Sequence, residues 1–142
     1  MKRKATAEWR GDLKTGRGTL TTDSGVLHDA RYSFTTRFEG EKGTNPEELV
    51  AAAHAGCFAM ALSGELGKVS LTAESLRVTA TVSLEKDASG WSITESNLEL
   101  AARVPGASPE AFQAAADSAK ANCPLSKLLK AKITLAARLE NA

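Results

Sequence analysis

One long helix constrains the fold of this chain more than any other segment. Residues 43–67, GTNPEELVAAAHAGCFAMALSGELG, include Asn45, whose side-chain oxygen suits a helix N-cap, and a proline follows at the first helical position. Glu48 lies three residues after the cap, as in a capping box. Gly64 and Gly67 are candidate C-terminal stops, because glycine readily adopts the left-handed conformation. The sequence therefore predicts a helix that starts at the proline and ends near these glycines.

The apolar run inside this helix predicts a buried position. From Leu49 to Leu62 its 14 residues include one histidine and no charged side chain. A helix that is apolar on every side is buried on every side. The many alanines and Gly56 predict that neighbouring elements pack closely against it. A run of this length is too short to cross a bilayer, so we expect a buried central helix and no membrane partner.

The segments around this helix predict an α+β fold. Alternating, β-branched and aromatic residues mark the strands, and clusters of glycine, aspartate and serine mark the turns between them. The first three strands should form an antiparallel meander with Arg37 on the third, and the next two should form a hairpin. At this length we expect a single domain, residues 1–142. The expected elements are strands at residues 4–9, 19–22, 32–38, 76–84, 91–104 and 133–139, and helices at residues 109–122 and 124–131.

Charge and composition exclude several classes of protein. The 18 basic and 17 acidic residues are interspersed along the chain, whereas nucleic-acid-binding proteins present a basic stripe. The first residues, MKRKATAEW, have no apolar segment after the basic ones and so do not predict a signal peptide. We therefore expect a cytoplasmic protein with no nucleic-acid partner, in a compartment that keeps thiols reduced. Two cysteines and two histidines make a poor zinc set, so we expect no metal and no cofactor.

Cys57 and Cys123 have the most distinctive chemistry in the sequence. Their separation excludes a local CxxC motif and leaves a transient catalytic or sensing disulfide, a structural disulfide, or two inert thiols. Cys123 precedes Pro124 and so falls at the cap of a short helix, where backbone N–H groups favour a thiolate. Cys57 lies in mid-helix, where apolar surroundings raise the pKa of a thiol, so it needs a neighbouring cation. His54, one turn back, is one candidate, and an arginine is a better one because it stays charged.

Two long sequence blocks carry a family resemblance. The first is TRFEGEKGTNPEELVAAAHAGCFAMAL, residues 36–62, and the second is ANCPLSKLLKAKITL, residues 121–135. Together they resemble the OsmC/Ohr family of organic hydroperoxide reductases, and most of all its osmotically inducible protein C branch. The resemblance covers the whole chain. It implies an OsmC-like fold in which two subunits form an intertwined homodimer with active sites at the interface.

The same resemblance implies a thiol-dependent peroxidase, an antioxidant oxidoreductase of the osmotic and oxidative stress response. Cys57 would attack the peroxide, and Cys123 would resolve the oxidised Cys57 into a redox-active disulfide. Arg37 and Glu47, the first glutamate of the long helix, would activate the thiolate as a pair. The expected partners are an organic hydroperoxide as substrate and a dithiol or lipoyl-type reductant.

Helix geometry adds a constraint on these four residues. Glu47 and Cys57 are ten residues apart in one helix, which is about 15 Å along its axis. We therefore expect Arg37 and Glu47 to act on the Cys57 of a second subunit. We also expect the long helices of the two subunits to pack together.

Simpler roles remain open for each candidate. Glu47 could interact with the helix dipole alone, and Arg37 could be a surface charge on a strand. His54 is expected to be a hydrogen-bonded core residue, outside the catalytic set. For the whole chain, the alternatives to a peroxidase are a non-catalytic redox sensor or binding protein that uses the same disulfide, and a structural protein with inert thiols.

Overall fold

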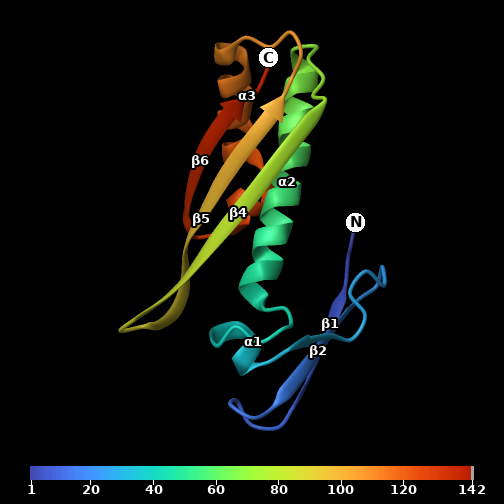
Figure 1. Ribbon diagram of the computed structural model, residues 1–142, viewed down its shortest axis with the longest axis vertical. Coiled ribbons are helices and arrows are strands. Elements are labelled where there is room, and N and C mark those ends of the chain that lie inside the picture. The colour runs from blue at the N-terminus through green and yellow to red at the C-terminus, as the bar shows by residue number, and fades with distance from the viewer. Residues whose placement is uncertain (142) are drawn as a thin grey trace. The chain divides into compact units, whose positions relative to one another are not determined.

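The computed structural model describes residues 1–141 and combines helices with two three-stranded sheets (Figure 1). The predicted α+β class is confirmed. The chain divides into two compact units, an N-terminal unit of residues 1–49 and a C-terminal unit from residue 50 onward, while the single domain stays a prediction. The elements in chain order are β1 Ala5–Arg10, β2 Arg17–Thr22, β3 Ala30–Tyr32, α1 Phe34–Phe38, α2 Pro46–Lys68, β4 Ser75–Asp87, β5 Gly90–Arg103, α3 Pro109–Asn122, α4 Pro124–Leu128 and β6 Lys132–Leu139.

The N-terminal sheet is the predicted antiparallel meander, in the order β1-β2-β3. Gly18 of β2 lies opposite Trp9 on one side and Tyr32 on the other. The ring centroids of Trp9 and Tyr32 lie 5.5 Å apart, and both rings pack against this glycine. A Cβ atom at Gly18 would lie 2.3 Å from the Tyr32 ring, so no larger residue fits without displacing it. Sheet pairing and ring packing thus fix the register together.

The predicted strand over residues 32–38 is wrong in its second half. Strand β3 ends at Tyr32, and α1 follows at once. Ser33 caps this helix, because its Oγ accepts from the Thr36 N–H at 3.1 Å and its own N–H donates to Thr36 Oγ1 at 2.8 Å. The aromatic residues that indicated a strand, Phe34 and Phe38, instead stack one helical turn apart. Arg37 therefore lies on a short helix and not on a strand.

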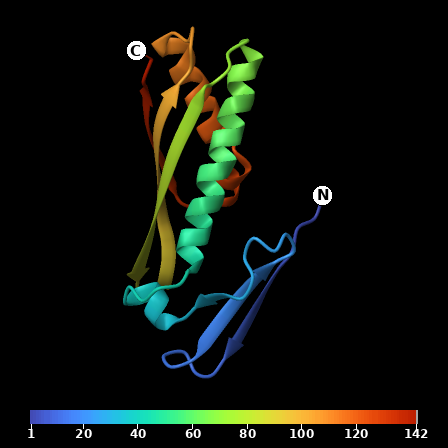
Figure 2. The same cartoon turned by 45° about the vertical axis from the view of Figure 1, so that its right-hand side comes forward.

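The C-terminal sheet has the order β4-β5-β6 (Figure 2). Strands β4 and β5 form the predicted hairpin, closed at residues 87–90. Strand β6 pairs with β5 in parallel, with Leu98 opposite Leu135. The expectation of wholly antiparallel pairing is therefore incomplete. The chain reaches β6 through α3 and α4, and such a helical crossover returns it in the same direction.

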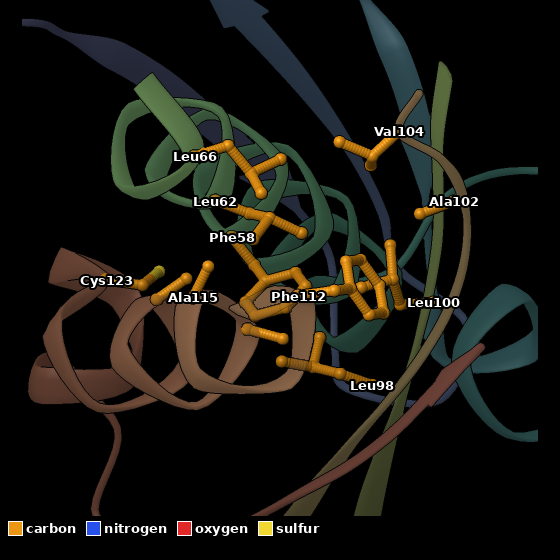
Figure 3. Packing of buried hydrophobic residues seen from close by; sticks show 12 residues of the cluster. Phe58, Leu62, Leu66, Leu98, Leu100, Ala102, Val104, Phe112, Ala115 and Cys123 are labelled. Carbon is orange, nitrogen blue, oxygen red and sulfur yellow. The ribbon is translucent and has the colours of Figure 1, made fainter. Parts of the chain in front are cut away.

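The hydrophobic core lies in the C-terminal unit, between α2, α3 and one face of this sheet (Figure 3). Side chains of α2 at four-residue intervals form a single stripe that faces β5 and α3. Every second residue of β5 from Ser96 to Ala102 is buried, which gives the sheet one apolar face. The buried hydrophobic residues are Phe58, Leu62, Leu66, Leu98, Leu100, Ala102, Val104, Phe112, Ala115, Ala116, Ala119 and Cys123.

Within the single chain the long helix is buried along one stripe: Met60 is 79% exposed, and nothing lies within 4 Å of a Cβ placed on Gly56. Burial on every side, which was expected together with a second subunit, stays a prediction. The predicted end of the helix needs correction, because it runs through both glycine stops to Lys68. The helix ends in a Schellman turn, in which the Leu71 N–H donates to Leu66 O at 3.0 Å and Ser70 takes the left-handed conformation.

By length and composition alone, α2 could cross a membrane. The apolar run Leu49–Leu62, which is too short for a span, is only part of this helix of 23 residues. In the fold, its buried stripe packs in the core of the C-terminal unit, and His54 lies within that stripe. Core helices of folded domains meet the same criterion of length and hydropathy.

Candidate active site

The two cysteines meet inside the C-terminal unit. Cys57 lies on α2, and Cys123 lies at the junction of α3 and α4, where its N–H closes the end of α3 on Ala119 O at 2.8 Å. Pro124 then begins α4, as predicted. The Cys123 thiol donates to Cys57 Sγ at 2.9 Å, and both thiols are free. Cys123 is fully buried and Cys57 partly exposed, so Cys57 is the sulfur that a solute reaches first.

The surroundings of Cys57 disfavour its thiolate. Burial raises the pKa of this thiol. Cys123 raises the same pKa further, mainly through the hydrogen bond between the two thiols and to a smaller extent because two sulfur anions this close would repel each other. The backbone N–H of Leu125 lowers the pKa by hydrogen bonding to the Cys57 sulfur. Among the described residues of the C-terminal unit, no lysine or arginine contributes to the shift. The expected need for a cation therefore stands.

His54 is buried one turn before Cys57, and both of its ring nitrogens are hydrogen-bonded. Nδ1 lies 2.7 Å from Ser96 Oγ on β5, and Nε2 lies 2.8 Å from Ser126 Oγ on α4. Burial lowers the pKa of this histidine, so the neutral ring is favoured. A neutral ring with one donor and one acceptor nitrogen is satisfied by two hydroxyl groups. The histidine is the hydrogen-bonded core residue that the sequence indicated.

Arg37 and Glu47 meet inside the N-terminal unit. Arg37 Nε donates to Glu47 Oε2 at 3.1 Å, and Nη2 donates to Oε1 at 2.6 Å. The guanidinium also lies over the Phe38 ring, 5.2 Å from its centroid. The Arg37 side chain is 35% exposed and the Glu47 side chain 14%. These contacts use Nε and Nη2, so among the described residues Nη1 makes no hydrogen bond.

The start of α2 presents Glu47 to this arginine. Asn45 Oδ1 accepts from the Glu48 N–H at 2.8 Å, so Asn45 is the predicted N-cap. The Glu48 carboxylate accepts from Thr44 Oγ1 at 2.8 Å, whereas a capping box would have it accept from the N–H of Asn45. Gly43 precedes this turn at φ 154°, where a Cβ would lie 2.6 Å from Thr36 Cγ2.

Sequence reasoning found both pairs and missed the polar contacts around the cysteines. Cys57 lies close to Cys123, and Arg37 close to Glu47, each pair within one unit. The serines that bind His54 were not singled out. A histidine inside an apolar run was the available signal, because a buried imidazole needs hydrogen-bond partners. Within residues 1–141, no group of three or more histidine, cysteine, aspartate or glutamate side chains could hold a metal ion.

Comparisons with known proteins show the family of this chain. The family model described as OsmC-like protein matches residues 39–138. Peroxiredoxin OsmC of Escherichia coli (strain K12) is 51% identical over 139 residues, which cover 98% of this chain and 97% of that one. Organic hydroperoxide resistance protein OhrB of Bacillus subtilis (strain 168) is 31% identical over 125 residues, which cover 87% of this chain and 89% of that one.

The crystal structure of that Bacillus protein has the same fold. It superposes with a TM-score of 0.71 at 28% identity, covering 95% of this chain and 98% of the other. The matched family model spans more than half of the present chain. On these grounds the chain belongs to the OsmC family.

Proposed function

We propose that this protein is a thiol peroxidase that reduces organic hydroperoxides, with Cys57 as nucleophile and Cys123 as resolving thiol. The observation that carries the proposal is the pair of free thiols 2.9 Å apart, one of them partly exposed. The names of the relatives support it, since one is a peroxiredoxin and the other an organic hydroperoxide resistance protein. Such a protein serves as an antioxidant.

The reaction proceeds in two balanced steps. The Cys57 thiolate attacks the outer oxygen of ROOH, an S–O bond forms as the O–O bond breaks, and RO⁻ leaves and takes up a proton to give the alcohol. The Cys123 sulfur then attacks the sulfur of Cys57–SOH. An S–S bond forms, and the hydroxyl leaves as water with the proton of the Cys123 thiol. A dithiol or lipoyl-type reductant then returns both thiols by exchange.

Arg37 supplies the charge that the first step needs. A guanidinium beside Cys57 offsets the burial that raises the pKa of this thiol, and its N–H groups stabilise the developing alkoxide. Glu47 holds the guanidinium by two parallel hydrogen bonds, and the Nη1 group stays available for a peroxide oxygen. Glu47 precedes Cys57 by ten residues on α2, about 15 Å along the helix. We therefore assign this pair to the Cys57 of the partner subunit.

Exposed apolar surface supports a homodimer. No hydrophobic side chain of residues 1–49 is buried in the single chain, and all of β1 is exposed. The face of α2 that carries Met60 and Gly56 is likewise uncovered. A folded monomer rarely leaves such surfaces in water. Two intertwined chains would cover both and would complete two active sites at the interface.

The apolar setting selects the substrate. Cys57 packs against the hydrophobic core cluster, so an alkyl or aryl group on the peroxide loses contact with water as it binds. Each buried methylene contributes about 0.8 kcal/mol. Organic hydroperoxides should therefore react faster than hydrogen peroxide. We also propose that the protein works in the cytoplasm, where a thiol reductant is at hand.

Peroxide consumption with dihydrolipoamide tests the function. The wild type should turn over tert-butyl and cumene hydroperoxide, Cys57→Ser should abolish turnover, and Cys123→Ser should complete one oxidation and then stall. If the wild type is oxidised once but does not turn over with excess dithiol, the result favours a redox sensor. If Cys57 reacts neither with peroxide nor with a mild alkylating agent, the result favours a structural protein with inert thiols.

A further inference from the structure

We propose that His54 is a positioning residue for disulfide formation, because its hydrogen bond to Ser126 holds α4 so that Cys123 stays against Cys57. The proposal rests on the two-step reaction above and concerns its second step. It gives a role to a buried imidazole that the chemistry of peroxide attack does not use.

The imidazole bridges two parts of the C-terminal unit. On one side, Nδ1 bonds to Ser96 Oγ, and this serine is fully buried on β5. On the other side, Nε2 bonds to Ser126 Oγ at 2.8 Å, three residues after Cys123. His54 itself is 0% exposed, so its ring orientation is fixed by packing and by β5. The ring thus offers α4 a rigid attachment point.

Helix α4 has few other attachments. It spans five residues, none of which is fully buried, and one of them, the partly buried Leu125, packs against the hydrophobic core. Pro124 lacks an N–H group, and the Cys123 side chain makes no capping hydrogen bond. The remaining backbone bonds of the segment, such as Lys127 N–H to Cys123 O, lie within it and do not tie it to the sheet. The bond between His54 and Ser126 is therefore a main polar restraint on this segment.

The restrained segment carries both groups that touch the Cys57 sulfur. One is the Cys123 thiol, and the other is the backbone N–H of Leu125. Once Cys57 is a sulfenic acid, the Cys123 sulfur must reach it before a second peroxide does. If α4 moves away, the effective concentration of Cys123 falls and the sulfenic acid persists. His54 acts through Ser126 and not as a base, because both ring nitrogens are already bonded.

Two pairs of variants and one conservative replacement separate this role from general support of the core. Ser126→Ala removes the bond to α4, and Ser96→Ala removes the bond to β5. His54→Gln places an amide near the position of Nε2, within reach of Ser126. His54→Asn places it near the position of Nδ1, within reach of Ser96 alone. Ser126→Thr restores a hydroxyl.

Single-turnover oxidation with one equivalent of cumene hydroperoxide gives the first readout. Dimedone trapping and intact mass report the sulfenic acid and the disulfide. In Ser126→Ala and His54→Asn, disulfide formation should slow about three- to tenfold, the range expected for one lost hydrogen bond. The rate of the first oxidation should stay within about twofold of wild type, because movement of α4 removes both the Leu125 N–H that lowers the Cys57 pKa and the Cys123 contact that raises it. His54→Gln and Ser126→Thr should recover most of the loss.

Equilibration with glutathione gives a readout that needs no peroxide. The ratio of disulfide to dithiol measures the effective concentration of Cys123 at Cys57. It should fall by about the same factor in Ser126→Ala, and a tenfold fall corresponds to about 30 mV for this two-electron couple. If Ser126→Ala forms the disulfide with the same yield and rate as the wild type, the proposal is overturned. A wild type that forms the disulfide with glutathione but ignores hydroperoxides would instead refute the peroxidase and leave the positioning role intact.

Discussion

The sulfur atoms of Cys57 and Cys123 lie 2.9 Å apart, although 66 positions separate the two residues in the sequence. Helix α2 supplies one sulfur, and the α3–α4 junction supplies the other. A disulfide bond measures about 2.05 Å, so a small movement of the α3–α4 junction is enough to join them. The two thiols are therefore already placed to form a disulfide. Within the described part of the C-terminal unit, the surroundings of Cys57 provide no cation that would stabilise its thiolate.

Replacing the arginine or its partner should slow peroxide attack. Arg37→Lys loses the two-pronged contact with Glu47, and Glu47→Gln loses the negative charge that holds the guanidinium. We expect kcat/KM for cumene hydroperoxide to fall about 100- to 1000-fold, as for loss of one preorganised donor. Stopped-flow oxidation of Cys57 measures this step directly.

The neighbouring glutamate provides the control. Glu48→Gln changes a carboxylate at the same helix end, but this one is bonded to Thr44 and not to Arg37. Its kcat/KM should stay near that of the wild type. If kcat/KM falls equally in Glu47→Gln and Glu48→Gln, the negative charge at the start of α2 matters and the contact with Arg37 does not. The role assigned to Arg37 would then be refuted.

Gly43 should be intolerant of any side chain. A Cβ there would lie 2.6 Å from Thr36 Cγ2 and 2.8 Å from Arg31 O, at a φ of 154°. We expect Gly43→Ala to destabilise the fold by about 2–3 kcal/mol from overpacking and backbone strain. Gly40→Ala is the matched control, since its φ is also positive, 73°, but nothing lies within 4 Å. It should cost about 1 kcal/mol. Urea unfolding measures both.

Local sequence signals predicted much of this fold because the responsible interactions are local. The N-cap at Asn45, the hairpin turn at residues 87–90 and the break at Pro124 each depend on residues within one turn. The strand expected at residues 32–38 failed because two hydroxyl side chains, Ser33 and Thr36, form a capping box that outweighs β propensity. The parallel pairing of β6 depends on a crossover of many residues, which no local pattern encodes.

The candidate site was predictable where chemistry restricts residue type. Two cysteines in a chain of this length attract notice at once, and the family resemblance connected them with Arg37 and Glu47. The His54 contacts were not predictable, because Ser96 and Ser126 are common residues whose positions only the tertiary fold brings to the ring. Apolar periodicity alone also could not say whether the exposed face of α2 is covered by this chain or by another one.

Acid should destabilise the protein through His54. Burial lowers the pKa of this histidine below 6.5, so the unfolded chain takes up a proton at a higher pH than the folded one. The stability from the neutral ring is fully present above about pH 6.5 and is lost as the pH falls toward the folded-state pKa. We expect the free energy of unfolding to fall between pH 6.5 and 5.5, by at most about 1.4 kcal/mol from this group.

His54→Gln should flatten this pH dependence, because glutamine does not titrate. Urea unfolding at pH 7.5, 6.5 and 5.5 measures the slope, and His28→Gln is the control that removes the other histidine. The carboxyl groups of Asp12, Glu65 and Asp87 do not interfere in this window, since their pKa values are lowered from ordinary values of 3.8–4.5. An unchanged slope in His54→Gln would mean that the buried ring is not the source.

Mixing two inactive variants tests whether the active site is shared between subunits. Cys57→Ser keeps Arg37 but has no nucleophile, and Arg37→Met keeps the nucleophile but has no guanidinium. In a heterodimer of the two, the Cys57 of one chain meets the Arg37 of the other only if the pair acts across the interface. Random reassociation of chains after mild denaturation would then restore about one quarter of wild-type activity, from one intact site in half of the dimers. If the pair acts within its own chain, neither site of the heterodimer is complete and the mixture stays inactive. Mixing Cys57→Ser with Cys57→Ser/Arg37→Met is the control, because no combination of those chains holds a nucleophile.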